Sequence, residues 1–213
     1  MSTPVRYDEQ YCPIARALDV LGDRWTMPIL RELSFGDQRF TDMREHLPGI
    51  APTVLTQRLR TMLDEGLVTT KPSSSPHRSI YALTERGRST APILRELARW
   101  GMPLLEPSHD GKTIRPAAAA AVAVRNYFDA SAAEGIDERY LLRIDGEPIT
   151  LSSVKGGGAT RDEADLEIDA SADVWIRIRQ GRISLKDARQ CGELHVKGPA
   201  RSLRNFQRIF QVA

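Results

Sequence analysis

Apolar residues recur at helical spacing in the first hundred positions, and proline and glycine bound the helices that they predict. In the segment "IAPTVLTQRLRTMLDEGLV", Leu55, Leu59 and Met62 recur at intervals of four and three residues. This spacing predicts a helix from near Pro52 to Gly66 that buries these side chains on one stripe. At about 100° per residue, the opposite, polar face carries Thr53, Thr56, Gln57 and Arg60.

Three further helices are predicted before this one. The first begins at Pro13 and stops at Gly22, and the second covers residues 23–33 with Asp23 as its N-cap. A short third helix has Thr41 as its cap. The tight segment "PGIAP" then leads into the polar-faced helix, and a turn of this length is typical of a helix-turn-helix.

After the polar-faced helix the pattern changes to short β-prone runs. Residues 67–70 and 80–83 flank a tip rich in proline and serine, which predicts a β-hairpin. Thr84 then caps a last helix, which ends at Gly101. Four helices, a hairpin and a further helix form a winged helix-turn-helix.

Residues 102–116 are rich in helix breakers and show no periodicity, so we place a domain boundary near residue 110. The predicted domains are 1–109 and 110–213. The second begins with an alanine-rich helix from about Pro116 to Glu134. Strands are predicted at 139–145, 147–154, 164–170 and 192–198.

Two segments of the second domain are helical or ambiguous. Residues 172–181 fit a strand or a helix, because both periodicities place apolar residues on one side. A closing amphipathic helix starts at Pro199. The domain is therefore predicted to be α+β, as is the chain as a whole.

Length and charge bear on the kind of protein. The chain has 213 residues, enough for two modest cores, and its net charge is only +2. Any DNA binding must come from a few locally placed arginines, since no basic tail is present. Cys12 and Cys191 fall in different predicted domains, and no signal peptide or membrane-spanning run is visible. We expect a protein of the reducing cytoplasm with no membrane contact.

The polar face of the 52–66 helix carries hydroxyls, an amide and a guanidinium, which are groups that bind phosphates and base edges. The plainer alternative is a solvated surface helix. His77 and Arg78 at the hairpin tip are placed to contact phosphate or a minor groove, unless the loop is simply solvated. Arg39 and Arg44 could add phosphate contacts or form surface salt bridges.

Three segments of the first domain resemble the HxlR family of bacterial winged-helix regulators. They are "CPIARALDVLGDRWTMPILREL", "RFTDMREHLPGIAPTVLTQRLRTMLDEGLV" and "YALTERGRSTAPILRELARWG", which cover nearly all of residues 11–101 in order and spacing. The resemblance implies a homodimer formed by the first and last helices, here those of Pro13 and Thr84. It also implies that Thr53, Gln57 and Arg60 contact double-stranded DNA in the major groove. Pro28 departs from the usual aliphatic residue and puts the start of its helix in question.

Cys12 has two interpretations. Some members of the resembled family sense oxidants or electrophiles through a cysteine at this position, and a thiol near a helix N-terminus has more thiolate. The alternative is a small buried residue at a dimer seam. Cys191, beside Gly192 in a predicted turn, is interpreted as structural.

The second domain resembles the sterol-carrier-protein-like domains. The resemblance rests on the order of elements, Gly181, Gly198 and the closing helix in "DLEIDASADVWIRIRQGRISLKDARQCGELHVKGPARSLRNFQRIF". It implies an apolar tunnel for a lipid-like molecule. The candidate lining residues, which would otherwise be plain core, are Trp175, Ile176, Leu185, Phe206 and Phe210.

No catalytic set is visible in the sequence. His195 lacks a metal partner at ligand spacing, and "GGG" at 156–158 lacks the strand-helix setting of a phosphate loop. We therefore expect no enzyme activity, no cofactor and no metal. The leading hypothesis is a homodimeric transcription regulator on a palindromic operator, with a C-terminal domain that binds an apolar effector or acts as a scaffold. The alternative is a lipid-carrier or ligand-binding protein whose winged helix mediates protein contacts.

Overall fold

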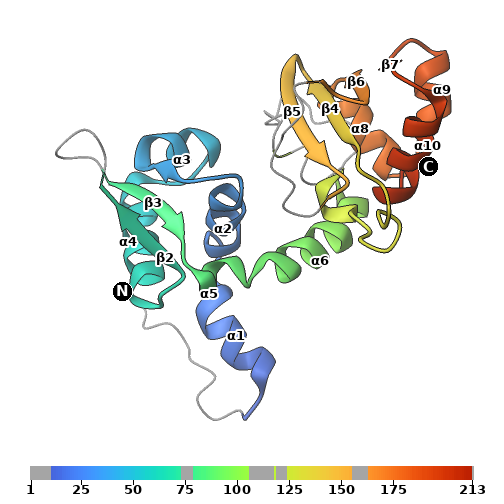
Figure 1. Cartoon of the computed structure of the whole chain (residues 1–213). Helices are drawn as coiled ribbons and strands as arrows, with labels where there is room; N and C mark the ends of the chain where they lie inside the picture. Colours follow the sequence, from blue (N-terminus) through green and yellow to red (C-terminus); the bar gives the residue numbers. More distant parts are fainter. Residues whose placement is uncertain (1–10, 73–78, 106–117, 119–123, 155–162, 213) are drawn as a thin grey trace. The chain divides into compact units, whose positions relative to one another are not determined.

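A computed structural model describes residues 11–72, 79–105, 118, 124–154 and 163–212 of the chain (Figure 1). The chain divides into two units, Met1–Leu94 and Arg95–Ala213. The predicted boundary near residue 110 lies outside the described residues and stays a prediction. No helix among the described residues is long and apolar enough to cross a membrane.

The first unit has the predicted order of helices and hairpin. Its three-stranded antiparallel sheet has the order β1-β3-β2, in which β1 is a short strand that was not predicted. In chain order the elements are α1 (Pro13–Leu21), α2 (Thr26–Ser34), β1 (Gln38–Arg39), α3 (Phe40–His46), α4 (Pro52–Asp64), β2 (Val68–Lys71), β3 (Ile80–Leu83), α5 (Glu85–Arg88) and the start of α6 (Ala91–Gly101), which continues into the second unit from Arg95 on.

Local sequence explains where α1 and α4 begin and end. Pro13 and Pro52 occupy first helical positions, where a missing N–H costs nothing. After α4, Gly66 has a φ of +66°, a conformation that other residues adopt only with strain. The predicted bounds of both helices are confirmed.

Two predicted helix starts are wrong. Asp23 does not cap α2 directly, because the helix begins at Thr26; Asp23 instead accepts a hydrogen bond from the Trp25 backbone N–H at 3.0 Å. Thr41 lies inside α3, whose N-cap is Arg39, and its hydroxyl donates to Asp42 at 3.0 Å.

The last predicted helix of the first domain is two helices, α5 and α6. Thr84 caps α5 as predicted, since its hydroxyl oxygen accepts from the Gly87 N–H at 3.0 Å. A Cβ at Gly87 would lie 2.1 Å from the Leu67 carbonyl oxygen, so only glycine allows α5 to pack there. Pro92 cannot donate to a preceding carbonyl, and α6 starts afresh at Ala91 and ends at Gly101 as predicted.

The core of the first unit lies beneath α4. Leu55, Leu59 and Met62 are buried, and they pack with buried residues of α2 and α3. The buried apolar partners in these helices are Ile29, Leu30, Leu33 and Met43. This core fixes which side of α4 faces solvent.

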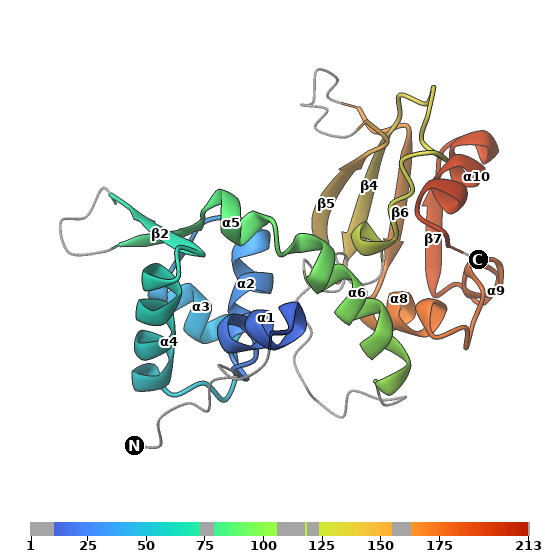
Figure 2. The same cartoon turned by 90° about the horizontal axis from the view of Figure 1, so that it is seen from below.

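The second unit is an α+β fold with a four-stranded sheet of order β5-β4-β6-β7 (Figure 2). Strands β4 and β6 are parallel, and the other pairs are antiparallel. Its described elements are η1 (Met102–Leu104), η2 (Arg125–Tyr127), β4 (Arg139–Ile144), β5 (Glu147–Ser152), β6 (Leu166–Ala170), α8 (Ala172–Arg179), α9 (Leu185–Gln190), β7 (Leu194–Lys197) and α10 (Ala200–Ile209).

Each predicted strand of this unit is confirmed. Asp145 and Gly146, with φ of 50° and 83°, form the two-residue connection of the β4–β5 hairpin. Alternate residues of β4, Tyr140, Leu142 and Ile144, are buried in one cluster with residues of α8, α9 and α10. The three helices therefore cover one face of the sheet.

The helices of this unit were predicted less well. Residues 172–179 form a helix, α8, because the Ser171 hydroxyl caps it by accepting from the Val174 N–H at 3.3 Å. Helix α9 was not predicted, whereas α10 follows Pro199 as expected. The predicted alanine-rich helix is wrong over residues 124–134, which form η2 and turns. Ala118 is helical, and the other residues from 116 to 123 lie outside the described residues.

Candidate nucleic-acid interface

The solvent face of α4 carries the four side chains that the sequence assigned to DNA. Thr53, Thr56, Gln57 and Arg60 are all exposed, while the stripe that includes Leu59 is buried. The Thr56 hydroxyl donates to the Pro52 carbonyl at 2.9 Å, which leaves its oxygen lone pairs available to accept. In the described part of the chain, Gln57 and Arg60 make no side-chain hydrogen bond or ion pair. Their polar groups are free for a partner.

Arg58, between these positions, has a different role that the sequence analysis missed. Its guanidinium forms an ion pair with Asp23, in the segment between α1 and α2. The same carboxylate accepts from the Trp25 N–H. Arg58 is half-buried, and its Nε lacks a hydrogen-bond partner among the described residues. The pair therefore holds α4 against the start of α2 and fixes the direction of its exposed face.

Arg39 lies beside the hairpin. It ends β1 and pairs with Ile80 of β3, so its exposed side chain emerges near the base of the wing, as we name the hairpin of β2 and β3. Its backbone N–H donates to Asp42 at 3.3 Å. Arg44 is exposed on α3. Both cations are available to phosphate groups.

The wing itself is described only at its base. Strands β2 and β3 pair from Val68 opposite Leu83 to Lys71 opposite Ile80. The predicted contact residues His77 and Arg78 lie outside the described residues. Lys71, which the sequence analysis did not select, pairs with Asp37 at 2.6 Å.

A polar network beneath α3 holds the helix-turn-helix together. Glu32 is fully buried and accepts from its neighbour Arg31 at 2.7 Å. The Gln38 amide donates to the Glu32 carbonyl at 2.7 Å, and His46 Nδ1 lies 3.1 Å from Gln38 Oε1. Residues of α2, β1 and α3 are thus linked by polar contacts as well as by the core.

Two helices carry apolar side chains on exposed surfaces. On α1, Ile14 and Leu18 are exposed, the first by 70%. On α6, no residue is fully buried, and Ile93, Leu97 and Trp100 are exposed, Trp100 by 73%. Large exposed apolar residues at helical spacing are typical of interaction surfaces.

The two cysteines are free thiols. Cys12 is partly exposed at the N-cap of α1, where its carbonyl accepts from the Arg16 N–H at 3.0 Å. Cys191 is exposed at the end of α9. The described residues contain no group of three or more His, Cys, Asp or Glu side chains able to hold a metal ion.

The residues predicted to line an apolar tunnel are packed against one another. The rings of Trp175 and Phe206 lie 6.2 Å apart, and those of Phe206 and Phe210 lie 5.0 Å apart. Leu185 is also buried, whereas Ile176 is partly exposed. The Trp175 indole N–H is buried without a hydrogen-bond partner among the described residues.

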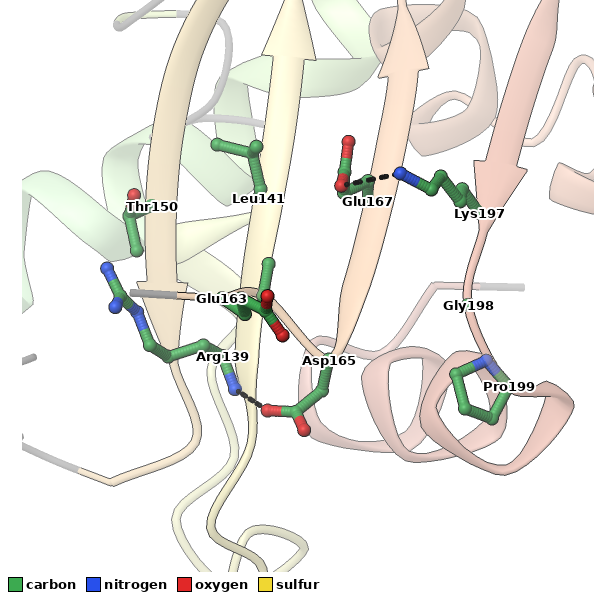
Figure 3. A pocket seen from close by; sticks show the side chains of 10 residues that line it. Arg139, Leu141, Thr150, Glu163, Asp165, Glu167, Lys197, Gly198 and Pro199 are labelled. Carbon is green, nitrogen blue, oxygen red and sulfur yellow. Dashed lines mark hydrogen bonds and ion pairs between the residues drawn. The ribbon is translucent and has the colours of Figure 1, made fainter. Parts of the chain in front are cut away.

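The open face of the second sheet holds a polar pocket of about 510 Å³ (Figure 3). Thr150, Leu141, Glu167 and Lys197 form one row across its four strands, and Lys197 lies 3.4 Å from Glu167. The remaining lining residues are Arg139, Glu163, Ala164, Asp165, Gly198 and Pro199. None of the tunnel candidates lines this pocket.

The helices, the β-hairpin and the exposed, polar α4 together form a winged helix-turn-helix. Residues 20–109 match the family model described as HxlR-like helix-turn-helix. The chain therefore belongs to the HxlR-like helix-turn-helix family, and its relatives are transcriptional regulators, not enzymes.

Two relatives support this assignment. The HTH-type transcriptional regulator YvaP of Bacillus subtilis is 36% identical over 101 residues, which are 46% of this chain and 94% of that protein. The HTH-type transcriptional regulator Mb3122 of Mycobacterium bovis is 36% identical over 142 residues, 66% of this chain and 82% of that protein.

Among solved structures, the reduced form of the transcriptional regulator YodB from B. subtilis is 30% identical with a TM-score of 0.40, over 46% of this chain and 99% of that chain.

Proposed function

We propose that the protein is a homodimer that binds a palindromic DNA operator, with α4 as its recognition helix. The observation that carries this proposal is the exposed set Thr53, Thr56, Gln57 and Arg60 above a buried apolar stripe. A two-fold symmetric dimer places two such helices one helical turn of DNA apart, which requires two half-sites related by the same symmetry.

The chemistry of each side chain suggests its contact. A glutamine amide forms two hydrogen bonds with adenine, and an arginine guanidinium forms two with guanine, so Gln57 and Arg60 are the proposed base contacts. Thr53 lies in the first turn, where the backbone N–H groups and the positive end of the helix dipole favour a phosphate. Arg39 at the base of the wing, and Arg78 in the sequence between its two strands, are proposed to bind backbone phosphates.

The test is an electrophoretic shift of the DNA upstream of the protein's own gene, with a two-site palindrome and a single half-site compared. We expect the palindrome to bind more tightly, with an affinity that falls steeply with salt. Equal binding of every DNA fragment at all salt concentrations would reject operator recognition. Failure to bind any of the fragments would favour a winged helix that mediates protein contacts.

The dimer is proposed to form through α1 and α6. Ile14 and Leu18 on one helix, and Ile93, Leu97 and Trp100 on the other, are exposed in the single chain. Burying apolar surface contributes about 25 cal/mol per Å², so a second copy that covers these side chains stabilises the folded chain.

For the second unit we propose an apolar effector that bears a hydrogen-bond acceptor. The supporting observation is the buried Trp175 N–H, which lacks an acceptor among the described residues. Because Phe206 and Phe210 are packed in the same core, the ligand enters only if α10 separates from the sheet. A fluorescent fatty acyl probe should therefore bind slowly and alter tryptophan emission, and Phe206→Asp should abolish the response if the fold survives.

Uptake of the probe without a change in operator affinity would reject the effector role. A ligand alters DNA affinity only if it binds the DNA-competent and DNA-incompetent states unequally. A folded protein that takes up no probe would have a filled core, and the second unit would then act as a scaffold.

A further inference from the structure

The second half of α6 is held by the body of the second unit through one aromatic ring. Tyr127, in η2, lies between two guanidinium groups: that of Arg179 from α8 is 3.9 Å from the ring centroid, and that of Arg99 from α6 is 5.0 Å from it. Arg99 also donates from Nε to the Asn126 carbonyl at 3.2 Å. The helix is thereby joined to η2 by a stack and a hydrogen bond.

Arg179 is the partly buried anchor of this stack. Its two terminal nitrogens donate to the Phe210 carbonyl at 2.6 Å and to the Gln211 carbonyl at 2.7 Å, just beyond the end of α10. Burial lowers the pKa of Arg179 to about 10, so the guanidinium remains charged at neutral pH. A cation over an aromatic face is attracted more strongly when both are shielded from water.

Gln180, the residue that follows α8, holds the segment after α6. The Gln180 amide donates to the Leu105 carbonyl at 3.0 Å and lies 3.5 Å from the Met102 carbonyl. These carbonyls belong to η1 and to the residue after it. Arg179 and Gln180 therefore make three kinds of contact. Arg179 binds the carbonyls after α10 and stacks on Tyr127, and Gln180 binds the segment that follows α6. We name Arg99, Tyr127, Arg179 and Gln180 the clamp.

The clamp and the exposed apolar residues lie on different sides of α6. At about 100° per residue, Arg99 points roughly 160° away from Leu97 around the helix axis. Leu97 and Trp100 are exposed, while the Arg99 side chain is only 31% exposed because it lies on Tyr127. The clamp can thus hold α6 from one side and leave the other to a second copy of the chain.

We propose that the clamp positions α6 for dimerisation and transmits movements of α10 to the dimer surface. This inference rests on the proposed function, because it assumes that α6 contacts a second copy. Arg179 binds the carbonyls at the end of α10, and Phe206 on that helix is a proposed ligand contact. Displacement of α10 therefore removes the acceptors of Arg179 and loosens its stack on Tyr127.

The test compares Tyr127→Leu with Tyr127→Phe in the full chain by sedimentation equilibrium and thermal unfolding. Leucine removes the aromatic face, whereas phenylalanine keeps it. We expect Tyr127→Leu to raise the dimer Kd by about tenfold, which corresponds to roughly 1.4 kcal/mol, and Tyr127→Phe to dimerise like the original protein. Ile168→Val, in the buried part of β6, is the control for general destabilisation and should leave the dimer Kd unchanged.

Four outcomes overturn the proposal: wild-type dimerisation by a folded Tyr127→Leu protein, an equal loss in Tyr127→Phe, an equal loss in Ile168→Val, and a monomeric original protein. If Tyr127→Leu does not fold, Arg99→Gln replaces it, because that side chain is partly exposed and reaches the ring from α6. A wild-type Kd for Arg99→Gln equally overturns the clamp, and a raised Kd supports it.

The same data separate this inference from the proposed dimer. Leu97→Asp tests the apolar surface of α6 alone. A dimer that is weakened by Leu97→Asp but not by Tyr127→Leu retains the proposed interface and rejects the clamp. A dimer that neither variant weakens rejects both.

Discussion

On α4, neighbouring positions face opposite environments. Leu59 is 1% exposed in the core, Gln57 is exposed, and Arg58 between them is half-buried against Asp23. The apolar spacing was enough to predict the first two environments. The half-buried position of Arg58 depends on Asp23, which lies 35 positions earlier in the chain, and no local pattern indicates that contact.

Gln57→Ala should weaken operator binding by about tenfold, since a base contact of two hydrogen bonds is worth about 1–3 kcal/mol. Its Tm should hardly change, because the side chain is exposed. The matched variant Leu59→Ala leaves a cavity and should cost about 2–5 kcal/mol of unfolding free energy. Gel shift and thermal unfolding of both proteins provide the check, and an equal drop in Tm would contradict the assigned faces.

Tyr140 provides a pH-dependent prediction. Burial, followed by the hydrogen bond to Glu138 at 2.8 Å, raises the pKa of its phenol well above the ordinary value of 10. Below pH 10 both the folded and unfolded chains keep the proton, and the contribution to stability is fully present. As pH rises further, the unfolded chain ionises first, so stability falls.

As pH rises above about 10, Tyr140→Phe should therefore lose less stability than the original protein. At neutral pH it should be less stable, because the Glu138 carboxylate loses a donor. Urea unfolding at a series of pH values measures both effects. Parallel curves for the two proteins would mean that another group causes the alkaline loss.

At the scale of elements, the sequence predicted what local chemistry determines. Pro13, Pro52 and Gly66 mark helix ends because the constraints on φ and on backbone donors act within a single turn. Two failures involve packing against distant residues. Gly87 of α5 packs against Leu67, and the apolar side of α8 packs in the core beside the sheet. The Ser171 cap of α8, in contrast, is local.

The candidate site was predictable to a similar extent. The exposed residues of α4 follow from periodicity, whereas the polar pocket over β4, β5, β6 and β7 depends on strand order. Glu167 and Lys197 are 30 residues apart and face one another only because β6 pairs with β7. The pairing of β6 with β7 cannot be predicted from the residue pattern of either strand alone.

For the wing, Arg78→Ala should weaken binding to all operator variants about equally. Loss of one phosphate contact should reduce the slope of log affinity against log salt by about 0.9. Lys186→Ala, which removes an exposed cation of α9, is the matched control and should keep the slope. An unchanged slope in Arg78→Ala would assign that residue to ordinary surface.

Cys12 lies at the N-terminus of α1, one of the two proposed dimer helices. If its thiol senses oxidants, treatment with diamide should release DNA from the original protein and from Cys191→Ser, but not from Cys12→Ser. The physical reason is that a bulky or cross-linked sulfur at the start of α1 displaces the helix from its partner. Equal release from all three proteins, measured by gel shift, would leave Cys12 with a packing role.

At the scale of the whole molecule, the two halves of the chain were predictable to different degrees. The first domain follows from motifs that extend over most of residues 11–101. The prediction of the second domain rests on the order of its elements. That order does not determine whether the core of the domain is filled or contains a cavity. Trp175, Phe206 and Phe210 are buried together, so the observation that still favours an internal ligand is the indole N–H, which lacks an acceptor among the described residues.

The proposed recognition of a palindromic operator requires a dimer, and Leu97→Asp tests that requirement. Leu97 is 49% exposed, so a carboxylate there should leave the single chain folded while opposing burial against a second copy. Val154→Asp is the matched control, because it places the same charge at a residue that is 43% exposed and lies outside α1 and α6.

We expect Leu97→Asp to sediment as a monomer at concentrations where Val154→Asp is dimeric. Its affinity for a palindrome should fall to that for a half-site, because the two recognition helices then bind independently and the gain from linking them is lost. Its affinity for a half-site should equal that of the original protein, since α4 is untouched. A monomer that still prefers the palindrome would show that DNA itself assembles two copies, and a dimer unaffected by Leu97→Asp would place the interface elsewhere.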